Sequence, residues 1–302
     1  MSRKVRLFIQ LSRPIFLIGG ALVYALGAGI ARYLGTPIDI GLYLIGQVWV
    51  TSLQLSTHYL NEYFDAPFDL NNTNRTPFSG GSGAIGPGKL ARNTALIAAM
   101  MTLTVLASFT VILLNQTQAS PLLVLLLLVM FFAAILYSTP PVQLSSSGYG
   151  ELTTSFLVAN LVPALAFFLQ YHDLHRLLAM STFPLTSLHL AMMITFELPD
   201  YGTDVKYEKN TLLVRLGWRS GMSLHNLLIL TAYLLLAIAA LFDLPLFIAL
   251  PAFLTLPLGL LQIWQIRRIA AGFKPNWNTL GLTAVALFAS MAYLLAFSFW
   301  TR

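Results

Sequence analysis

The sequence contains no cysteine and few charged residues. Without cysteine, disulfide bonds and thiolate chemistry are both excluded. Charged residues make up 9% of the chain, whereas a typical soluble domain carries about 25%. Hydrophobic residues make up 57%. Such a chain cannot cover its apolar surface when it is surrounded by water, so the composition predicts a polytopic membrane protein.

Nine apolar segments approach the ~20 residues that a helix needs to cross a bilayer. They cover residues 14–34, 41–62, 93–114, 120–138, 151–170, 179–198, 222–242, 244–265 and 278–300. Segment 244–265 contains three prolines, which membrane helices tolerate when neighbouring groups satisfy the backbone. We therefore expect an all-α fold in which residues 1–302 form a single transmembrane domain. Nine transmembrane helices would surround a central cavity that opens toward the cytoplasmic face.

Basic residues indicate the orientation of these segments. With the N-terminus placed in the cytoplasm, all 17 lysines and arginines except Arg32, Arg176 and Arg302 fall on the cytoplasmic side. This distribution follows the positive-inside rule. The net charge of +6 is spread over the loops, which favours membrane topology over nucleic-acid binding. The sequence predicts an integral protein of the cell (inner) membrane and leaves its oligomeric state open.

The few acidic residues follow a repeated pattern. Only 11 are present, and the pattern E-x-x-D-x-x-x-D occurs twice, as Glu62-Tyr-Phe-Asp65-Ala-Pro-Phe-Asp69 and as Glu197-Leu-Pro-Asp200-Tyr-Gly-Thr-Asp204. This spacing places the three carboxylates of each copy on one face of a helix. Both copies end apolar segments on the same side of the membrane. Carboxylates crowded there would repel one another, so we expect them to bind a divalent metal.

Basic residues accompany both acidic motifs. Arg75 follows the first motif and lies within the glycine-rich stretch 74–83. Lys206 and Lys209 follow the second motif. Carboxylates bind Mg²⁺ through one or two oxygens and leave positions for phosphate oxygens. Lysine and arginine neutralise the remaining phosphate charge. The motifs therefore predict a site for a magnesium-bound diphosphate at the membrane surface.

The membrane setting indicates a long hydrocarbon on that diphosphate, and a prenyl diphosphate combines both parts. Departure of the diphosphate leaves an allylic cation, which an electron-rich acceptor captures. Tyrosine rings can stabilise such a cation. Tyr63, Tyr137 and Tyr201 lie on the expected side of the membrane.

These residues resemble the UbiA superfamily of intramembrane aromatic prenyltransferases. Asn61-Glu-Tyr-Phe-Asp65-Ala-Pro-Phe-Asp69 is similar to its first motif, N-D-x-x-D-x-x-x-D, with Glu62 in an aspartate position. Asp200-x-x-x-Asp204 matches the second motif, and 209–217 resembles the K-x-T-L-A-V-R-L-G segment that follows it. The loop from Tyr137 to Glu151 is also similar. Within the superfamily, the sequence looks most like the 1,4-dihydroxy-2-naphthoate polyprenyltransferases of menaquinone synthesis.

The resemblance implies a prenyltransferase that uses Mg²⁺, a prenyl diphosphate and a small aromatic acceptor. It implies metal-diphosphate roles for residues of both motifs, with Tyr137 near the reacting carbon. Metal ligands are expected at Asn61, Glu62, Asp65, Asp69, Glu197, Asp200 and Asp204. Asp65, Asp69, Asp200, Asp204 and Tyr137 are expected to be catalytic, and the substrate-binding residues are expected to be Asn61, Arg75, Ser79, Glu151, Lys206 and Lys209.

Besides Glu62, four positions depart from the family pattern, and one of them is Glu197, which stands where the related branch often has asparagine or aspartate. Pro67 lies inside the first motif and could end or kink its helix. Pro199 and Gly83 stand where related sequences often have arginine, which removes positive charge. These differences leave open other acceptors, namely 4-hydroxybenzoate, homogentisate, a tetrapyrrole, glycerol phosphate or a sugar phosphate.

Other interpretations of these residues also remain open. Arg75 and Lys209 could be positive-inside anchors, Tyr137 an interfacial tyrosine, and Glu151 an acid favoured at a helix N-terminus. Cation-coupled transporters place acids in repeated, broken membrane helices. Here the acids end the apolar segments, and the sequence around the two motifs is not repeated.

Overall fold

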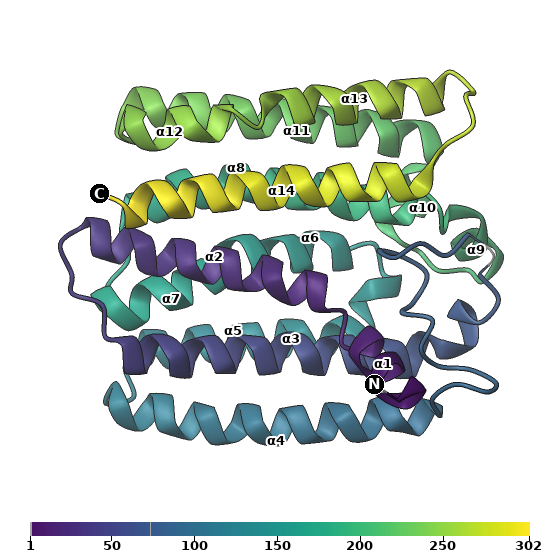
Figure 1. The fold of residues 1–302 in the computed structure, drawn as a ribbon, viewed down its shortest axis with the longest axis horizontal. Coiled ribbons are helices and arrows are strands. Elements are labelled where there is room, and N and C mark those ends of the chain that lie inside the picture. Colours follow the sequence, from purple (N-terminus) through teal and green to yellow (C-terminus); the bar gives the residue numbers. More distant parts are fainter. Residues whose placement is uncertain (1, 73) are drawn as a thin grey trace.

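The protein is a bundle of long, roughly parallel helices (Figure 1). The structure is a computed structural model that describes residues 2–72 and 74–302, and this part of the chain contains no β-strand. Seven long helices are continuous: α2 (Pro14–Tyr33), α3 (Ile40–Asp69), α4 (Arg92–Gln116), α5 (Pro121–Ser138), α8 (Arg176–Glu197), α11 (Trp218–Phe242) and α14 (Trp277–Trp300). The expected all-α fold is confirmed.

Two further membrane segments are built from shorter helices. The first joins α6 (Gly150–Phe156), a π-helical turn η2 (Leu157–Leu161) and α7 (Val162–Tyr171). The second joins α12 (Leu246–Phe253) and α13 (Leu256–Ala270). Pro163 lies in the first turn of α7, directly after the π turn, and Pro257 lies in the first turn of α13. At both positions the missing proline N–H changes the helical hydrogen-bond pattern. The proline-rich segment expected at 244–265 is therefore helical and extends to Ala270.

Eight helical segments within the described residues are long and apolar enough to cross a membrane. The helix α3 is the ninth expected segment, and it packs along α4 with the other long helices (Figure 1). It is not among the eight apolar segments because it is less apolar than they are, and its second half carries polar and acidic residues. The N- and C-termini lie at opposite ends of the bundle, which fits an odd number of crossings. The count of nine stays a prediction.

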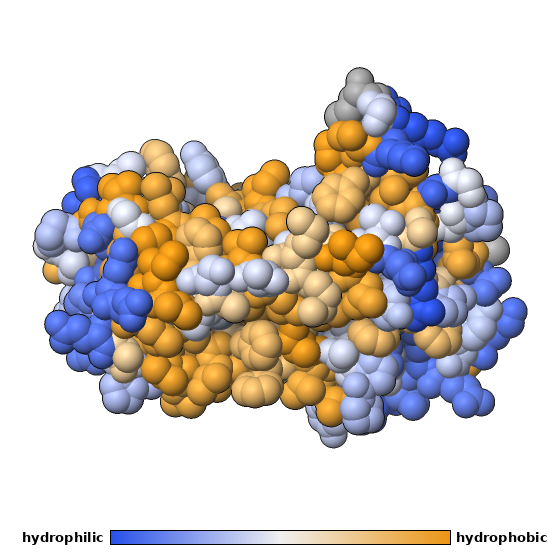
Figure 2. Space-filling view, turned by 90° about the horizontal axis from the view of Figure 1, so that it is seen from below, coloured by the Kyte–Doolittle hydropathy of each residue, from blue (hydrophilic) through white to orange (hydrophobic). Residues whose placement is uncertain are grey.

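The surface supports a membrane location. Figure 2 shows a broad hydrophobic band that crosses the molecule between two hydrophilic ends. Inside the bundle, one large hydrophobic core includes the fully buried side chains of Tyr24, Trp49, Phe167 and Phe299. The hydrophobic residues therefore serve both the core and the outer face, as expected for helices in lipid.

Short helices gather at one end of the bundle. These are α1 (Arg3–Leu11), η1 (Leu144–Ser146), α9 (Tyr201–Lys206) and α10 (Leu212–Leu216). They lie with the α3–α4 loop at the end of the bundle where the N-terminus is drawn (Figure 1). This end contains both acidic motifs, so the fold brings together two segments that are about 130 residues apart in the sequence.

Pro67 does not end the helix that carries the first motif. The helix α3 continues to Asp69, and Leu70 caps it. Proline lacks the N–H that would bond to the carbonyl oxygen of Tyr63, four residues earlier. Arg92 Nε donates to that oxygen instead, at 2.6 Å. Asp69 therefore keeps its helical position one turn after Asp65.

The second motif does not lie on one helix, so the expectation of three carboxylates on a single helical face is wrong there. The helix α8 ends at Glu197, and a turn of three residues leads to α9. Pro199, which cannot donate a backbone hydrogen bond, lies in this turn. Asp200 caps α9 and Asp204 lies within it. The turn separates Glu197 from the two aspartates.

Candidate active site

A cavity of about 360 Å³ opens between the helices. One part is polar and is lined by both acidic motifs. The other part is apolar and is lined by side chains such as Ile18, Leu157, Met192 and Phe288. Its volume lies in the range of ~300–1,000 Å³ that small-molecule sites occupy. A ligand with one charged end and one hydrocarbon end would match both parts.

Asp65 is the centre of the first motif in the cavity. Its carboxylate accepts hydrogen bonds from Asn61 Nδ2 at 3.1 Å and from Gln143 Nε2 at 3.2 Å. Lys209 Nζ lies 3.0 Å from Asp65 Oδ2 and forms an ion pair with it. Asp65 and Lys209 are 144 residues apart in the sequence, so this pair joins the regions of the two motifs directly.

Asp200 and Asp204 bring the second motif to the same polar part of the cavity. Asp200 accepts a hydrogen bond from Asn72 Nδ2 at 2.6 Å. Burial raises the pKa of Asp200 above its ordinary value, although Asn72 and Lys209 oppose this effect. Burial also raises the pKa of Asp204 to about 7, where Lys209 opposes the shift and Asp200 adds to it. The positive charge near both aspartates is thus too small to offset the effect of burial on their pKa values.

Lys209 brings a positive charge into this group of carboxylates. Burial lowers its pKa, but Asp65, Asp69 and Asp204 outweigh burial and keep the pKa above its ordinary value. Its ammonium group also lies 5.1 Å from the centre of the Phe68 ring. Lys209 therefore stays charged at the polar end of the cavity, as a phosphate-binding lysine must.

The glycine-rich loop passes between the two motifs. Gly80 and Gly81 have φ angles of 74° and 76°, in the left-handed region that glycine adopts without strain. A Cβ atom at Gly81 would clash with the carboxylate of Asp69, and one at Gly80 would crowd Asn72 and Asp200. Ser79, Gly80 and Gly81 all line the cavity. The glycines are therefore needed where the backbone passes close to the acids.

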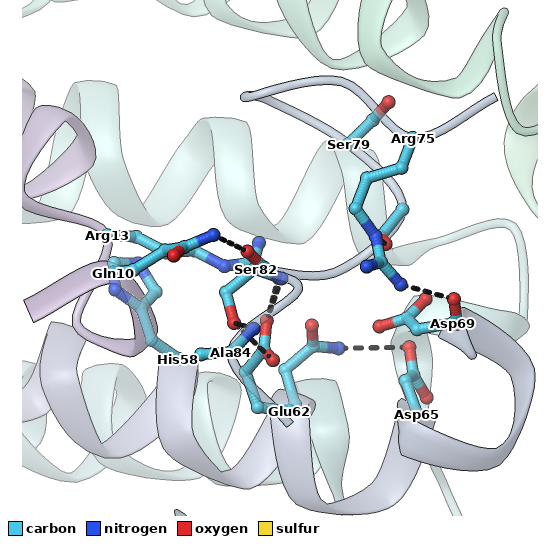
Figure 3. A network of polar contacts seen from close by, with 12 residues as sticks. Gln10, Arg13, His58, Glu62, Asp65, Asp69, Arg75, Ser79, Ser82 and Ala84 are labelled. Atoms are coloured by element: carbon cyan, nitrogen blue, oxygen red, sulfur yellow. Dashed lines mark hydrogen bonds and ion pairs between the residues drawn. The ribbon is translucent and has the colours of Figure 1, made fainter. Parts of the chain in front are cut away.

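Glu62 does not line the cavity, contrary to its expected role as a metal ligand. Its buried carboxylate forms an ion pair with Arg13 and accepts hydrogen bonds from the Ser82 N–H at 2.5 Å and from Ser82 Oγ at 2.7 Å (Figure 3). Gln10 Nε2 donates to the Ser82 carbonyl oxygen at 2.6 Å. Both oxygens of Glu62 are thus engaged in holding the glycine-rich loop against α3 and the segment before α2.

Two basic residues expected to bind substrate also lie off this cavity. Arg75 donates to the carbonyl oxygens of Gly80 and Asp69, so its guanidinium group stabilises its own loop (Figure 3). The exposed Lys206 points to the ring of Tyr207, with 5.6 Å between Nζ and the ring centre. The remaining expected residues do line the cavity: Asn61, Asp65, Asp69, Ser79, Tyr137, Glu151, Glu197, Asp200, Asp204 and Lys209.

Tyr137, Glu151 and Glu197 form a second polar group in the cavity wall. Tyr137 lies close enough to Asp65, Glu151 and Glu197 to be affected by their charge. Glu151 and Glu197 lie beside each other, because the successive backbone N–H groups of Leu212 and Leu213 donate to their carboxyl groups. Glu197 therefore lies next to another carboxyl group, although it was expected among the metal ligands.

Several residues of the site were missed by the sequence analysis. Arg13 lines the cavity, whereas Asn72 and Gln143 bond to the aspartates. Phe78 stacks on Phe196 with ring centres 5.7 Å apart and an interplanar angle of 5°, and both rings line the cavity. Single basic, amide and aromatic residues form no spacing pattern that predicts a site. The sequence signal for Arg13 was its position directly before Pro14, which begins the first apolar segment.

Within residues 2–72 and 74–302, no three histidine or carboxylate side chains converge on one point as a ready metal site. The acids lie around the cavity instead, with Asp69 near Asp65 and Asp204 near Asp200. Each pair offers the oxygen ligands that Mg²⁺ prefers, and such sites take their other oxygens from substrate phosphates and water. The chemistry of the donor set therefore fits magnesium held together with a diphosphate.

Comparison with known proteins identifies a matching family. The model of the UbiA prenyltransferase family matches residues 21–274. A search of curated proteins by sequence gives no match.

Solved structures with the same fold include a UbiA homolog from Archaeoglobus fulgidus bound to GPP and Mg²⁺. It has a TM-score of 0.71 and 16% identity, and the alignment covers 98% of this chain and 100% of that one. A UbiA homolog from Aeropyrum pernix K1 has a TM-score of 0.64 at 12% identity, covering 94% and 96%. Digeranylgeranylglyceryl phosphate synthase has a TM-score of 0.60 at 14% identity, covering 99% and 98%.

Proposed function

The chain belongs to the UbiA prenyltransferase family, and on this basis we propose that it transfers a prenyl group from a prenyl diphosphate to a small aromatic acceptor within the membrane. One observation carries the proposal: a single cavity joins Asp65, Asp69, Asp200, Asp204 and Lys209 to an apolar space between membrane helices. The charged end fits a metal-bound diphosphate and the apolar part fits its hydrocarbon.

Magnesium is the cofactor of this proposal. Asp65 and Asp69 would hold it on one side and Asp200 and Asp204 on the other, with Asn61 fixing Asp65. A homologue of the same fold binds GPP and Mg²⁺, which supports the assignment. When bound, Mg²⁺ supplies positive charge that stabilises the departing diphosphate.

The residues of this chain then act around the breaking bond. Lys209 binds the diphosphate oxygens, because it is charged and lies among the aspartates. The carbon–oxygen bond breaks and the diphosphate leaves with the electron pair. The aromatic acceptor forms a bond to the allylic carbon and loses a proton. Tyr137, Phe78 and Phe196 line the cavity and present aromatic faces that stabilise the cation and exclude water.

The acceptor that the sequence resemblance favours is 1,4-dihydroxy-2-naphthoate, which places the reaction in menaquinone-type quinone synthesis. The stacked rings of Phe78 and Phe196, with Phe16 edge-on at 5.8 Å from Phe196, offer flat apolar surfaces for such a ring. Glycerol phosphate is a second candidate, because digeranylgeranylglyceryl phosphate synthase has the same fold. We also propose that the polar end of the cavity faces the cytoplasm, which is supported by the positive-inside distribution of basic residues.

The proposed function is tested with purified protein in liposomes, geranyl diphosphate, Mg²⁺ and a panel of acceptors. The panel contains 1,4-dihydroxy-2-naphthoate, 4-hydroxybenzoate, homogentisate and glycerol phosphate, and products are identified by mass spectrometry. We expect a prenylated product from 1,4-dihydroxy-2-naphthoate. If only glycerol phosphate gives a product, then glycerol phosphate, and not an aromatic compound, is the acceptor. If no acceptor gives a product, the proposed reaction is contradicted.

A further inference from the structure

The pair formed by Glu151 and Glu197 lies in the cavity wall and is not used by the metal-diphosphate site. Glu151 lies in the first turn of α6 and is 3% exposed, while Glu197 ends α8. Each carboxyl group accepts a hydrogen bond from the first turn of α10. The Leu212 N–H donates to Glu151 Oε1 at 3.2 Å, and the Leu213 N–H donates to Glu197 Oε2 at 3.0 Å. Two successive backbone amides thus fix the pair in place.

The polar groups of this pair are not fully satisfied. Among residues 2–72 and 74–302, no N–H or O–H group donates to Glu151 Oε2, although the atom is buried. Its carboxyl neighbour Glu197 accepts only the Leu213 N–H among the described residues. Each carboxyl oxygen has two lone pairs, so two backbone amides leave several lone pairs of the pair without donors. A buried acceptor without a donor is costly unless a ligand supplies one.

No basic side chain pairs with these two glutamates in the described residues. Lys209 forms its ion pair with Asp65, and Arg13 forms its own with Glu62. Carboxyl groups without a basic partner repel a carboxylate or phosphate, and their free lone pairs favour a neutral hydrogen-bond donor.

The position of the pair connects it to the reacting carbon. Tyr137, the aromatic residue assigned to the allylic group, lies near both glutamates and near Asp65. A ligand group that contacts Glu151 is therefore beside the place where the acceptor must stand. An acidic cluster alone would not identify a site, but here a buried, unsatisfied oxygen belongs to a side chain that lines the cavity.

We propose that the Glu151–Glu197 pair receives a hydroxyl group of the acceptor, so that the acceptor presents a phenol or hydroquinol, and not an anionic group, to this wall. This inference rests on the proposed function. It adds an orientation: a carboxylate on the acceptor points away from the pair, and the hydroxyl points toward it. The hydrogen bond holds the electron-rich ring beside the allylic carbon.

The test measures binding and does not depend on turnover. Wild-type protein in nanodiscs is loaded with Mg²⁺ and geranyl thiolodiphosphate, which resists ionisation, and is titrated with 1,4-naphthalenediol under anaerobic conditions or with 1,4-dimethoxynaphthalene. The dimethyl ether keeps the ring but cannot donate a hydrogen bond. We expect wild type to bind the diol roughly tenfold or more tightly than the ether, because hydrogen bonds to charged groups are strong.

The same titrations with Glu151→Gln should remove most of this preference by weakening the diol alone. Glu208→Gln is the matched control, because Glu208 is exposed in the loop after α9, and it should keep the wild-type preference. Equal binding of diol and ether to wild type would overturn the inference. So would equal weakening of both ligands by Glu151→Gln. If geranyl thiolodiphosphate itself fails to bind with Mg²⁺, the proposed function fails instead, so the two failures are distinguishable.

Discussion

Replacing Asp65 with asparagine should remove most of the activity while leaving the shape of the site almost unchanged. Asparagine has the size of aspartate, but its single side-chain oxygen can accept from only one of Asn61 and Gln143, which donate to different oxygens of Asp65 at 3.1 and 3.2 Å. The larger loss is one negative charge facing the metal. A unit charge about 4 Å from another contributes roughly 4 kcal/mol at an effective dielectric constant of about 20.

Part of this loss is offset within the site. Lys209 is bound to Asp65 at 3.0 Å, and it gains freedom to turn toward the diphosphate when that partner is neutral. We therefore expect a net loss of about 3 kcal/mol in transition-state stabilisation, which corresponds to a turnover lower by roughly 100-fold. The matched control is Asp173→Asn, the same substitution at an exposed loop position outside the cavity.

The assay measures diphosphate release from geranyl diphosphate by purified protein in liposomes at saturating Mg²⁺ and acceptor. Both variants are first compared with wild type by thermal unfolding, so that a folding defect is recognised. Turnover of Asp65→Asn within threefold of wild type would refute the electrostatic reasoning. An equal loss in Asp173→Asn would show that the effect is not specific to the cavity.

Three further predictions concern other groups around the site. Lys209→Ala should raise the KM for geranyl diphosphate by roughly 10- to 100-fold, since a charge-assisted contact contributes about 1.5–3 kcal/mol; an unchanged KM would exclude Lys209 from the diphosphate site. Glu62→Gln should change the Kd of Mg²⁺ by less than about threefold, because Glu62 binds Arg13 and Ser82 and does not line the cavity. The Kd is measured by calorimetry with geranyl thiolodiphosphate present. A loss of Mg²⁺ affinity larger than that in Asp65→Asn would show that Glu62 is a metal ligand. Burial raises the pKa of Asp204 to about 7, so below that pH a proton must leave before metal binds, and the Kd of Mg²⁺ should fall as the pH rises from about 6 to about 8; a Kd that does not change with pH would contradict this.

The sequence predicted the helical segments well because their hydrophobic runs are long and their interruptions few. The segment expected at 120–138 is the helix Pro121–Ser138, and the one expected at 278–300 is Trp277–Trp300. Lipid leaves few alternatives to a helix for such runs. The first acidic motif was also predicted correctly as one helical face, since α3 includes Glu62, Asp65 and Asp69.

The second motif shows where spacing failed. A pattern at positions 0, 3 and 7 predicts a common face only if the helix is continuous, and the turn containing Pro199 interrupts it. The proline itself was a signal, because it removes a helical donor. Asp200 and Asp204 still reach the cavity because α9 begins immediately after the turn.

The polar partners within the site could not be predicted from spacing. Arg13 and Glu62 are 49 residues apart, and Asn72 and Asp200 are 128 apart. Such pairs depend on helix packing and on the conformation of the glycine-rich loop, which local patterns do not specify. For this reason Glu62 was expected to bind metal, although its carboxylate holds Ser82 and Arg13 (Figure 3).

The central claim is that the two acidic motifs act together on a prenyl diphosphate. It is tested most directly by diphosphate release from geranyl diphosphate in liposomes with an aromatic acceptor, with Mg²⁺ or with chelator. The account predicts release and a prenylated product with Mg²⁺, and neither with chelator. Cation flux across the liposome membrane without any release of diphosphate would contradict it and would favour a transporter.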